Sequence, residues 1–337
     1  MRVTQIAPPW IPVPPVTYGG TELMVAALIQ GLVEEGVEIW LFSAGDSTLP
    51  VPQYGHFPKS FWPPDKFSEN LHLSYAFARL RQQPPAVIHS HLENAAGFWA
   101  LAPTAPLVIT IHTPLFPMKR DYLLSFPQVH LVTVSAFQKR QLDGHPHLHL
   151  IPHGLNLADY PFQADKEDFL LFLGRIYPDK GLHTAIRLAR EAGERLIIAG
   201  PVFEPDRAYF DRQIRDQIDG DRIIYVGPAD HACKVDLMKR ARALVLPLEV
   251  DETFGLAMIE AMACGTPVLA YARGAVPEVV VQDETGFAMQ TYAELRDSLP
   301  RLATLDPRRC REQVAKNFSQ ERMVLSYLKL YEEMAAP

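Results

Sequence analysis

The sequence predicts an α/β protein with two doubly wound, Rossmann-like domains in tandem, each built on a parallel sheet. Short apolar segments alternate with segments of helical periodicity, which is the order of a parallel sheet. The alternation runs in two series that meet near residues 151–162 (IPHGLNLADYPF). Ligands bind beside the carboxyl ends of the strands in such sheets. We therefore expect a central cleft that the two domains face.

The first series begins with a strand at 2–7, a helix at 21–36 and a strand at 37–45. Thr21 is the expected N-cap of this helix, and Gly36 is the expected stop. Three further apolar segments predict strands at 86–90, 106–113 and 129–135. A stretch rich in proline and aromatic residues, 46–65, is expected to form a long loop.

The second series begins with a strand at 168–174 and a helix at 181–193. Further strands are predicted at 194–200, 221–227, 242–248 and 266–272. A charged helical stretch occupies 307–334. We expect an N-terminal domain at 1–155, a C-terminal domain at 156–318, and a helix at 319–337 that returns to the N-terminal domain.

The composition excludes several classes of protein. With 48% hydrophobic and 21% charged residues, the 337-residue chain has the balance of a globular protein with room for two domains. Its three cysteines are far apart, which fits a reducing compartment and argues against a disulfide framework or a cysteine zinc site. A net charge of −7 disfavours nucleic acid as a partner, so an anionic ligand would need a local cationic pocket.

The sequence contains neither of the apolar segments that target a chain to a membrane. No stretch of 18 apolar residues exists, so no transmembrane helix is expected. The start, MRVTQIAPPW, lacks the apolar core of a signal peptide. We therefore expect a cytoplasmic protein.

A lone acid interrupts an otherwise apolar helical segment, because Glu260 is the only polar side chain between Gly255 and Cys264. A helix that is apolar on all sides should be buried, and a buried carboxylate is costly unless it is paired or hydrogen-bonded. Glu260 must therefore have a structural partner, such as Arg273, or a ligand that donates hydrogen bonds.

The beginning of the same helix is expected at the cleft, because the strand at 242–248 precedes it. Free backbone N–H groups at 253–256 would then point into the cleft, and Gly255 would let a ligand approach closely. Such a helix end favours an anion-bearing ligand. Glu252 lies beside it, and either acts on the ligand or only favours the helix dipole. Two acids at one edge also suggest a glycosidase pair, but a simple glycoside has no anion.

Cations that could meet the anion follow the first strand of the second series. Arg175 leaves the end of that strand, and Lys180 lies five positions later, where the next helix begins. Arginine binds phosphate oxygens with a fork of donors, and lysine acts as a point charge; the alternative is a solvent-facing pair. In the first series, Gly19 and Gly20 could let backbone N–H groups hold a diphosphate. GxGxxG and GxxxxGK[ST] are absent, which disfavours nicotinamide binding and a P-loop.

Taken together, these segments resemble the retaining glycosyltransferases of family 4, which have the GT-B fold. ETFGLAMIE matches the E-x7-E motif of that family, and AMACGTPVLA, GAVPEVV and TGFAM match the segments that follow it. GRIYPDKG, IPHGLN and YGGTE match its other landmarks. The start of the chain is similar to a bacterial subgroup whose members glucosylate pteridines or modify natural products.

The resemblance implies a role for each matching residue. Arg175 and Lys180 would hold the donor diphosphate, Glu252 the transferred sugar, and Glu260 the ribose hydroxyls. His112, at a strand end, matches a histidine near the reacting sugar; the alternative is a core histidine. Further donor contacts are implied for Gly19, Gly20, Gly227, Phe254, Gly255 and Leu256. Thr253 departs from the family, which often has proline or a small residue there.

The resemblance also implies the reaction. The donor would be a nucleotide diphosphate sugar, UDP-glucose, and the acceptor a small molecule such as a pteridine, a natural product or a sugar. The leaving phosphate would take the acceptor's proton, and neither a metal nor a cofactor is expected. The one D-x-D sequence, Asp219–Asp221, is expected in a turn. A non-catalytic nucleotide-sugar-binding protein and a nucleotide-sugar epimerase are the alternatives.

Other segments of the first series are assigned to its rim. His145, His147 and His149 would share one face of an extended segment, as a rim strand or, alternatively, as a metal site. Residues 117–126 could form an amphipathic helix on the acceptor side. Exposed aromatic residues in loops would suit a flat or sugar-like acceptor; these are Trp10, Tyr18, Trp62 and Phe116. Membrane docking is not expected, because the helix at 21–35 has no Lys or Arg.

Overall fold

The computed structural model describes residues 1–336 and divides the chain into two compact units. Unit 1 contains Met1–Gly154 and the C-terminal segment that begins at Gln320, and unit 2 contains Leu155–Ser319. The boundaries expected from the sequence, after residues 155 and 318, each lie one residue from these divisions. Each unit is built on one parallel sheet, which confirms the predicted fold class.

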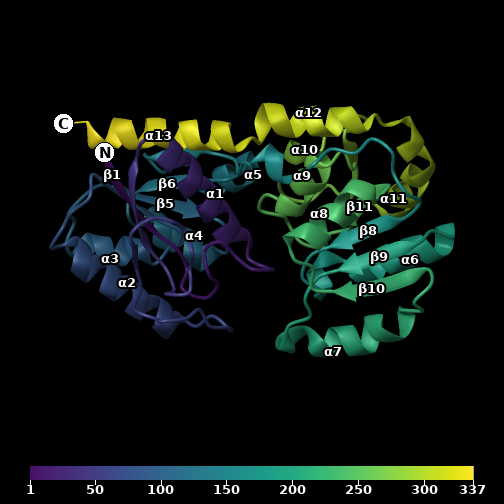
Figure 1. Ribbon diagram of the computed structural model, residues 1–337, viewed down its shortest axis with the longest axis horizontal. Coiled ribbons are helices and arrows are strands. Elements are labelled where there is room, and N and C mark those ends of the chain that lie inside the picture. Colours follow the sequence, from purple (N-terminus) through teal and green to yellow (C-terminus); the bar gives the residue numbers. More distant parts are fainter. Residues whose placement is uncertain (337) are drawn as a thin grey trace. The chain divides into compact units, whose positions relative to one another are not determined.

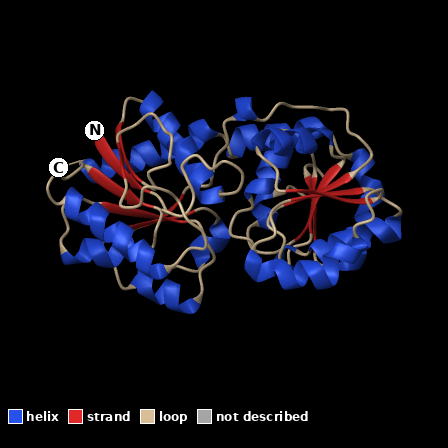
Figure 2. Cartoon of the chain, turned by 60° about the horizontal axis from the view of Figure 1, so that its bottom comes forward, coloured by secondary structure: helices blue, strands red, loops and turns tan. Residues whose placement is uncertain are grey.

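Unit 1 has a seven-stranded sheet in the order β3-β2-β1-β4-β5-β6-β7, and every pair of neighbours is parallel. The strands are β1 (Arg2–Ile6), β2 (Glu38–Phe42), β3 (Gln53–Tyr54), β4 (Val87–Ser90), β5 (Leu107–Ile111), β6 (His130–Thr133) and β7 (Leu148–Leu150). The helices are α1 (Gly20–Glu34), α2 (Lys66–Leu80), α3 (Ala95–Leu101), α4 (Pro117–Leu124), α5 (Ala136–Arg140) and α13 (Gln320–Ala335). Figure 2 shows the strands enclosed by helices.

Both faces of this sheet are buried, because successive side chains of a strand point to opposite faces. One face packs against α1 and α13 and includes Val87 and Val108. The other packs against α2 and α3 and includes Ile88 and Leu107. In Figure 1, α13 is yellow and lies along α1, although the two helices are far apart in sequence. The C-terminal helix therefore covers part of the first sheet.

Unit 2 has a six-stranded parallel sheet in the order β10-β9-β8-β11-β12-β13. The strands are β8 (Leu170–Leu173), β9 (Leu196–Ala199), β10 (Ile223–Gly227), β11 (Ala243–Leu246), β12 (Val268–Tyr271) and β13 (Gly286–Met289). The α-helices are α6 (Leu182–Ala192), α7 (Arg207–Tyr209), α8 (His231–Arg240), α9 (Leu256–Ala263), α10 (Val276–Val279), α11 (Tyr292–Ser298) and α12 (Pro307–Asn317). Short 3₁₀ or π turns are η1 (Leu157–Asp159), η2 (Pro178–Lys180), η3 (Glu204–Asp206), η4 (Phe210–Ile214), η5 (Arg215–Gln217) and η6 (Leu299–Thr304).

The structure corrects several local expectations. Gly19, not Thr21, is the N-cap of α1, whereas Gly36 is the stop that was expected, since it follows the C-cap Glu35 with φ 78°. The single helical stretch expected at 307–334 is two helices, α12 and α13, which belong to different units. The sequence analysis did not predict α2, α3, β3 or β13. Within residues 1–336, no helix is both long and apolar enough to span a bilayer.

Candidate functional site

The beginning of α9 offers an anion site at the carboxyl edge of the unit 2 sheet. The chain leaves β11 at Leu246 and enters α9 at Leu256, with Gly255 as the N-cap. Gly255 has φ 95°, a left-handed conformation that strains any residue with a Cβ, so glycine is favoured there. The first N–H groups of a helix have no acceptor within it and carry partial positive charge. Phe254, Gly255 and Leu256 thus lie where the sequence predicted an anion.

Lys180 and Glu252 form an ion pair in front of this helix. Lys180 Nζ lies 2.6 Å from Glu252 Oε2, and the Thr253 N–H donates to Glu252 Oε1 at 3.1 Å. The loop that carries Lys180 packs tightly on the loop after β11, since a Cβ on Gly181 would lie 1.9 Å from the Pro247 carbonyl oxygen. Two segments 72 residues apart thus bring a cation and an acid together.

Arg175 is also paired with an acid. Its Nη2 lies 2.6 Å from Asp206 Oδ2, and its guanidinium carbon lies 4.9 Å from the Tyr177 ring centroid. Burial raises the pKa of Tyr177, and the charges of Lys180, Glu252 and Arg175 act on the same hydroxyl. The predicted diphosphate ligands and the predicted sugar ligand therefore surround one tyrosine.

Glu260 has two partners within the protein. The Tyr160 hydroxyl donates to Glu260 Oε1 at 2.8 Å, and Lys234 forms an ion pair with the same oxygen. Glu260 is 4% exposed, and these two donors provide the hydrogen bond and the ion pair that a buried carboxylate needs. The prediction that Arg273 pairs with Glu260 is therefore wrong. In the part of the chain that the structure describes, both donors bind Oε1, so a ligand hydroxyl can be received at Oε2.

Three glycines leave the neighbouring carboxyl edge without side chains. Gly174, Gly200 and Gly227 lie at the ends of β8, β9 and β10, each with positive φ. A Cβ on Gly200 would lie 1.8 Å from the Gly174 carbonyl oxygen, so the two loops touch through their backbones. Gly227 has nothing within 4 Å of its Cβ position, which leaves open space at this predicted donor contact.

In unit 1, Gly19 and Gly20 follow a long loop rather than a tight turn, because β1 ends at Ile6. Gly19 has φ 150°, and a Cβ there would lie 2.8 Å from Glu22 Oε2. Glu22 is 4% exposed, and burial raises its pKa to about 7. The predicted phosphate contact therefore lies beside a buried acid, whose protonated form would not repel a phosphate.

His112 follows β5 and belongs to a group of histidines at the carboxyl edge of the unit 1 sheet. Its Nε2 lies 2.8 Å from His91 Nδ1, and its ring stacks on His153 with 5.1 Å between centroids. Burial lowers the pKa of His112 to about 4 and that of His91 well below its usual value. These histidines are therefore neutral hydrogen-bonding groups at neutral pH.

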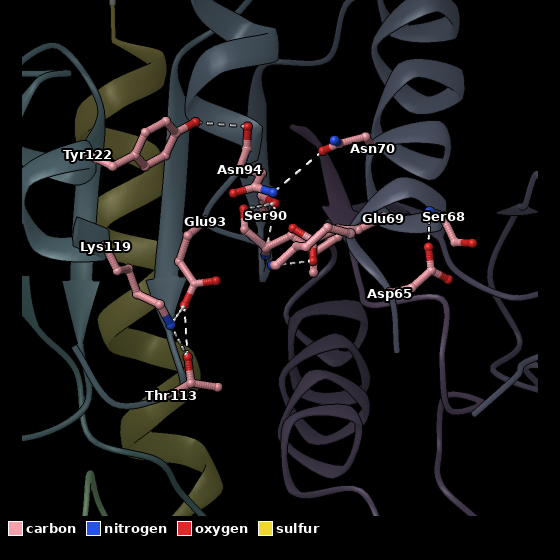
Figure 3. Close-up of polar contacts among 12 residues, drawn as sticks. Asp65, Ser68, Glu69, Asn70, Ser90, Glu93, Asn94, Thr113, Lys119 and Tyr122 are labelled. Carbon is pink, nitrogen blue, oxygen red and sulfur yellow. Dashed lines mark hydrogen bonds and ion pairs between the residues drawn. The ribbon is translucent and has the colours of Figure 1, made fainter. Parts of the chain in front are cut away.

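Glu93 and Lys119 form a charged pair at the same edge of the sheet, and Thr113 joins it (Figure 3). Lys119 Nζ lies 2.9 Å from Glu93 Oε1 and 2.5 Å from Thr113 Oγ1, and Thr113 also donates to Glu93 at 3.0 Å. Burial acts to raise the pKa of Glu93, but Lys119, a backbone N–H and the Thr113 hydroxyl together lower it. Glu93 acts electrostatically on His112, so the pair and the histidine share one region.

The structure contains both the turn expected at Asp219 and the histidine-rich segment that leads into β7. The turn at Asp219 is confirmed, because its Oδ1 accepts from the N–H groups of Asp221, Arg222 and Ile223. The rim strand is confirmed in part: β7 lies at the edge of the sheet and contains His149, whose Nε2 lies 3.1 Å from His130 Nδ1, but His145 and His147 precede the strand. Within residues 1–336, no set of three His, Cys, Asp or Glu side chains could hold a metal ion.

The acceptor-side features are also formed. The predicted amphipathic helix is α4, Pro117–Leu124. Tyr18, Trp62 and Phe116 are exposed, whereas Trp10 is partly buried against the core.

Sequence reasoning missed the partners of the predicted residues. Asp206, Lys234 and Tyr160 lie 31, 26 and 100 positions from the residues that they bind, so no local pattern identifies them. His91 and Glu93 could have been found, because they follow the end of β4 as His112 follows the end of β5. The rule that ligands gather at the carboxyl ends of parallel strands applies equally to both.

Two family models match consecutive parts of the chain. The model described as Glycosyltransferase Family 4 matches residues 18–159, and the model described as Glycosyl transferases group 1 matches residues 160–317. The glycogen synthase of Mycobacterium tuberculosis is 30% identical over 241 residues, which cover 61% of this chain and 56% of that protein. The chain thus spans about half the length of the curated relatives it matches.

Solved structures extend the similarity over the whole chain. AviGT4, a glycosyltransferase involved in avilamycin A biosynthesis, has 25% identity and a TM-score of 0.74, covering 99% of this chain and 98% of that one. Anabaena HepE in complex with UDP and glucose has 14% identity and a TM-score of 0.78, covering 98% and 99%. With the two family models covering 18–317 and this shared fold, the chain belongs to the GT-B glycosyltransferases.

Proposed function

We propose that this protein is a retaining glycosyltransferase that moves glucose from UDP-glucose to a hydroxyl of a small acceptor. The observation that carries the proposal is the ion pair of Lys180 and Glu252 just before α9, with Arg175 nearby against Tyr177. Two cations and a helix N-terminus suit a diphosphate, and an adjacent carboxylate suits sugar hydroxyls. The GT-B fold of HepE holds UDP and glucose, so the fold can accept such a donor.

On this proposal, unit 2 stabilises the leaving group. The bond between the anomeric carbon and the phosphate oxygen breaks, and its electron pair passes to the β-phosphate. Arg175, Lys180 and the N–H groups of α9 would meet the charge that develops there. We propose that these groups supply the positive charge, so that transfer needs no metal ion or other cofactor.

The two acids of the E-x7-E motif would bind opposite ends of the donor. Glu252 would accept hydrogen bonds from the transferred sugar, and its pairing with Lys180 holds it beside the diphosphate site. Glu260 Oε1 is held by Tyr160 and Lys234, which leaves Oε2 for the ribose hydroxyls. Gly227 and the glycines of the neighbouring strands would let the nucleotide lie close to the backbone.

The acceptor hydroxyl would attack the anomeric carbon from the face that the phosphate leaves, so that configuration is retained. Its oxygen forms the new bond to carbon, and its proton passes to the departing phosphate oxygen. No carboxylate nucleophile is then required. His112 in unit 1 would contact the reacting sugar, while Gly19 and Gly20 would contact the phosphates.

Unit 1 would select an acceptor that is neutral and carries hydroxyls. Its candidate groups are neutral histidines and the internally balanced pair of Glu93 and Lys119. A carboxylate of this kind accepts hydrogen bonds from hydroxyl or amine donors. A pteridine, a natural product or a sugar has such donors, and AviGT4 offers a precedent in natural-product biosynthesis.

The proposal is tested first by thermal shift with a panel of nucleotide sugars. UDP-glucose should stabilise the protein most, and the stabilising donor is then assayed against pteridines, sugars and natural-product alcohols. The expected result is a glucosylated acceptor with the anomeric configuration of the donor, with unchanged yield in EDTA. Conversion of the donor without an acceptor would indicate an epimerase. Binding without turnover across the acceptor panel would indicate a non-catalytic binding protein.

The acceptor side is tested separately with Glu93→Gln. This change keeps the shape but weakens the bond to Lys119 and to a hydroxyl, so acceptor kcat/KM should fall by roughly 10-fold. The donor affinity should not change. Glu38→Gln, at an exposed position of the same unit, is the control. A fall in donor affinity with unchanged acceptor KM would remove Glu93 from the acceptor site.

A further inference from the structure

A continuous chain of hydrogen bonds runs through the interior of unit 1 from α13 to His112. On one side of Gln5 it passes through Tyr331, His89 and Thr110 to Tyr327, over distances of 3.2, 2.6, 2.7 and 2.7 Å. On the other side it passes through His91 to His112, over distances of 2.9 and 2.8 Å. The chain therefore joins the C-terminal helix to a predicted site residue.

Strand periodicity places these groups on one face of the sheet. Val87 packs on that face, and two-residue steps along the same strand lead to His89 and then His91. The same steps lead from Val108 to Thr110 and then His112. Each strand therefore changes from apolar to polar side chains toward its carboxyl end.

The partners from α13 lie on a single helix face. Tyr327 and Tyr331 are one helical turn apart, so both reach the polar rows of the sheet. Both tyrosines are buried, with 2% and 0% of their surface exposed. Gln5 lies directly opposite His89 in the register of β1 and β4.

The Gln5 amide determines which group donates in each hydrogen bond of this chain. Its Nε2 donates to the Tyr331 hydroxyl, so its Oε1 faces His91 and can only accept. His91 must therefore carry its proton on Nε2. Because His91 is neutral, its Nδ1 is a bare lone pair, and the proton in the bond to His112 belongs to His112 Nε2.

This leaves His112 Nδ1 as an acceptor without a donor. His112 is neutral as well, so its single proton is committed to His91. Within residues 1–336, His112 Nδ1 is a buried nitrogen with no hydrogen-bond partner. An unsatisfied buried polar atom costs about 1–3 kcal/mol, and buried polar atoms without partners are uncommon.

We propose that Gln5, His91 and Tyr331 are positioning residues that hold His112 as its Nε2–H tautomer, so that Nδ1 accepts a hydrogen bond from a hydroxyl of the bound carbohydrate. The identity of the ligand as a carbohydrate rests on the proposed function. The consequence is specificity, because a site built around an unpaired acceptor rejects a ligand that cannot donate to it.

The hydrogen bonds on the other side of Gln5, from Tyr331 to Tyr327, have the same donor-to-acceptor order, which makes this order testable. Tyr331 accepts from Gln5 and donates to His89 Nδ1, His89 donates to Thr110, and Thr110 donates to Tyr327. If the Gln5 amide were reversed, every one of these bonds would reverse with it. His112 would then carry its proton on Nδ1 and would donate to the ligand. The two directions give opposite results in the experiments below.

The first experiment reads the tautomers without using activity. Long-range ¹H–¹⁵N spectra of the full-length protein distinguish a protonated from a bare ring nitrogen. The expected result is a proton on Nε2 in both His91 and His112. A proton on Nδ1 of His112 would overturn the inference even if the protein proves to be an active glucosyltransferase. Absence of any transfer, with the Nε2–H tautomer present, would instead count against the proposed function.

The second experiment compares deoxy and deoxyfluoro analogues of the donor sugar and of the acceptor, one hydroxyl at a time. A fluorine can accept a weak hydrogen bond but cannot donate one. At one position, both analogues should lower kcat/KM by roughly 10- to 100-fold. In His112→Ala, neither analogue at that position should lower kcat/KM relative to the unmodified substrate. A fluoro analogue that retains activity where the deoxy analogue loses it would overturn the inference.

The positioning role is tested with two matched tyrosine variants. Tyr331→Phe removes the bond that orients the Gln5 amide, so discrimination against the deoxy and fluoro analogues should fall several-fold. Tyr327→Phe removes a hydroxyl from the same helix and the same core, but at the end of the hydrogen-bond chain that is farthest from His112. It should leave the discrimination against the two analogues unchanged. An equal loss in both variants would indicate a merely structural role for Tyr331.

Discussion

The two units of this protein build their candidate sites from different chemistry. In unit 2, Arg175, Lys180 and Lys234 are each paired with a carboxylate. In unit 1, the corresponding edge of the sheet is dominated by neutral histidines and buried hydroxyls, with Glu93 and Lys119 as its charged pair. One site is rich in balanced charge, and the other is rich in hydrogen bonds between uncharged groups.

On the proposed function, this difference would let one fold serve two kinds of ligand. Both sites use the same position, the carboxyl ends of parallel strands, so the architecture alone does not distinguish them. Paired charges can be exchanged for the charges of a diphosphate, whereas neutral donors and acceptors match hydroxyls. We therefore expect changes of charge to affect the donor in unit 2, and changes of protonation to affect unit 1.

The largest effect should come from removing both cations of unit 2. Arg175→Ala with Lys180→Ala should lower kcat by about 1000-fold or more, since loss of one preorganised donor to developing charge costs about 100- to 1000-fold. Steady-state transfer assays would measure it. Arg187→Ala, an exposed cation on α6 of the same unit, is the control. A double variant with the turnover of the original protein would place the donor site elsewhere.

The next effect concerns Glu22, a buried acid of unit 1 that has no salt bridge within residues 1–336. Its pKa is raised by burial from 4.5 to about 7, so the folded state holds a proton that the unfolded state has lost over this range. The free energy of unfolding should therefore fall as the pH rises from about 4.5 to about 7. The loss attributable to Glu22 is about 3 kcal/mol.

Urea unfolding of the original protein and of Glu22→Gln at about pH 5 and pH 8 would measure this term. The variant should lack the loss between the two pH values, because its side chain does not ionise. Glu35→Gln, at an exposed position just after α1, should behave like the original protein. Parallel pH profiles for all three proteins would show that Glu22 does not titrate in this range.

A smaller effect is expected at Glu260, the paired acid of unit 2. Donor affinity should fall by roughly 10-fold in Glu260→Gln, because a neutral amide is a weaker acceptor for ribose hydroxyls. Calorimetry with UDP-glucose and its 2′-deoxy and 3′-deoxy ribose analogues would distinguish a ribose-binding role of Glu260 from a purely structural one. The original protein should discriminate against at least one analogue, and Glu260→Gln should not. Unchanged donor affinity would leave Glu260 with Tyr160 and Lys234 as its only partners.

The smallest effect is expected at Asp206, which competes with the donor for Arg175. Asp206→Asn should strengthen the binding of UDP by a few-fold, since the guanidinium no longer has to leave a carboxylate. The gain should shrink at high salt. Asp211→Asn, in an ion pair with Arg215 on the protein surface, is the control. Weaker UDP binding in Asp206→Asn would show that Asp206 orients Arg175 rather than competing for it.

Much of the fold could be predicted because its signals are local. Apolar strands such as 168–174 and the helix that ends at Gly193 are marked by periodicity and by a glycine stop. The helix α2 was missed because its first turns are mostly polar, and α3 was missed because it has only seven residues. The division between α12 and α13 was missed because both helices are polar on the outside, and only the units that they join distinguish them.

The candidate site was predictable in part for a different reason. Residues such as Arg175 and Glu252 lie at strand or helix ends, where sequence order alone predicts a site. Their partners arrive from distant segments, as Asp206 and Lys234 show. The protonation of His112 depends on a path through Gln5 and α13, and no pattern in sequence reports such a path. Local rules thus identify the positions, and tertiary contacts decide their chemical state.

The placement of α13 has a consequence for how this protein is made. The strands of the first sheet leave the ribosome long before Tyr331, which bonds to Gln5 across 326 positions. All of unit 2 is translated between them. Unit 1 therefore cannot be completed until all of unit 2 has been synthesised, and before that point one face of its sheet is covered by α1 but lacks α13.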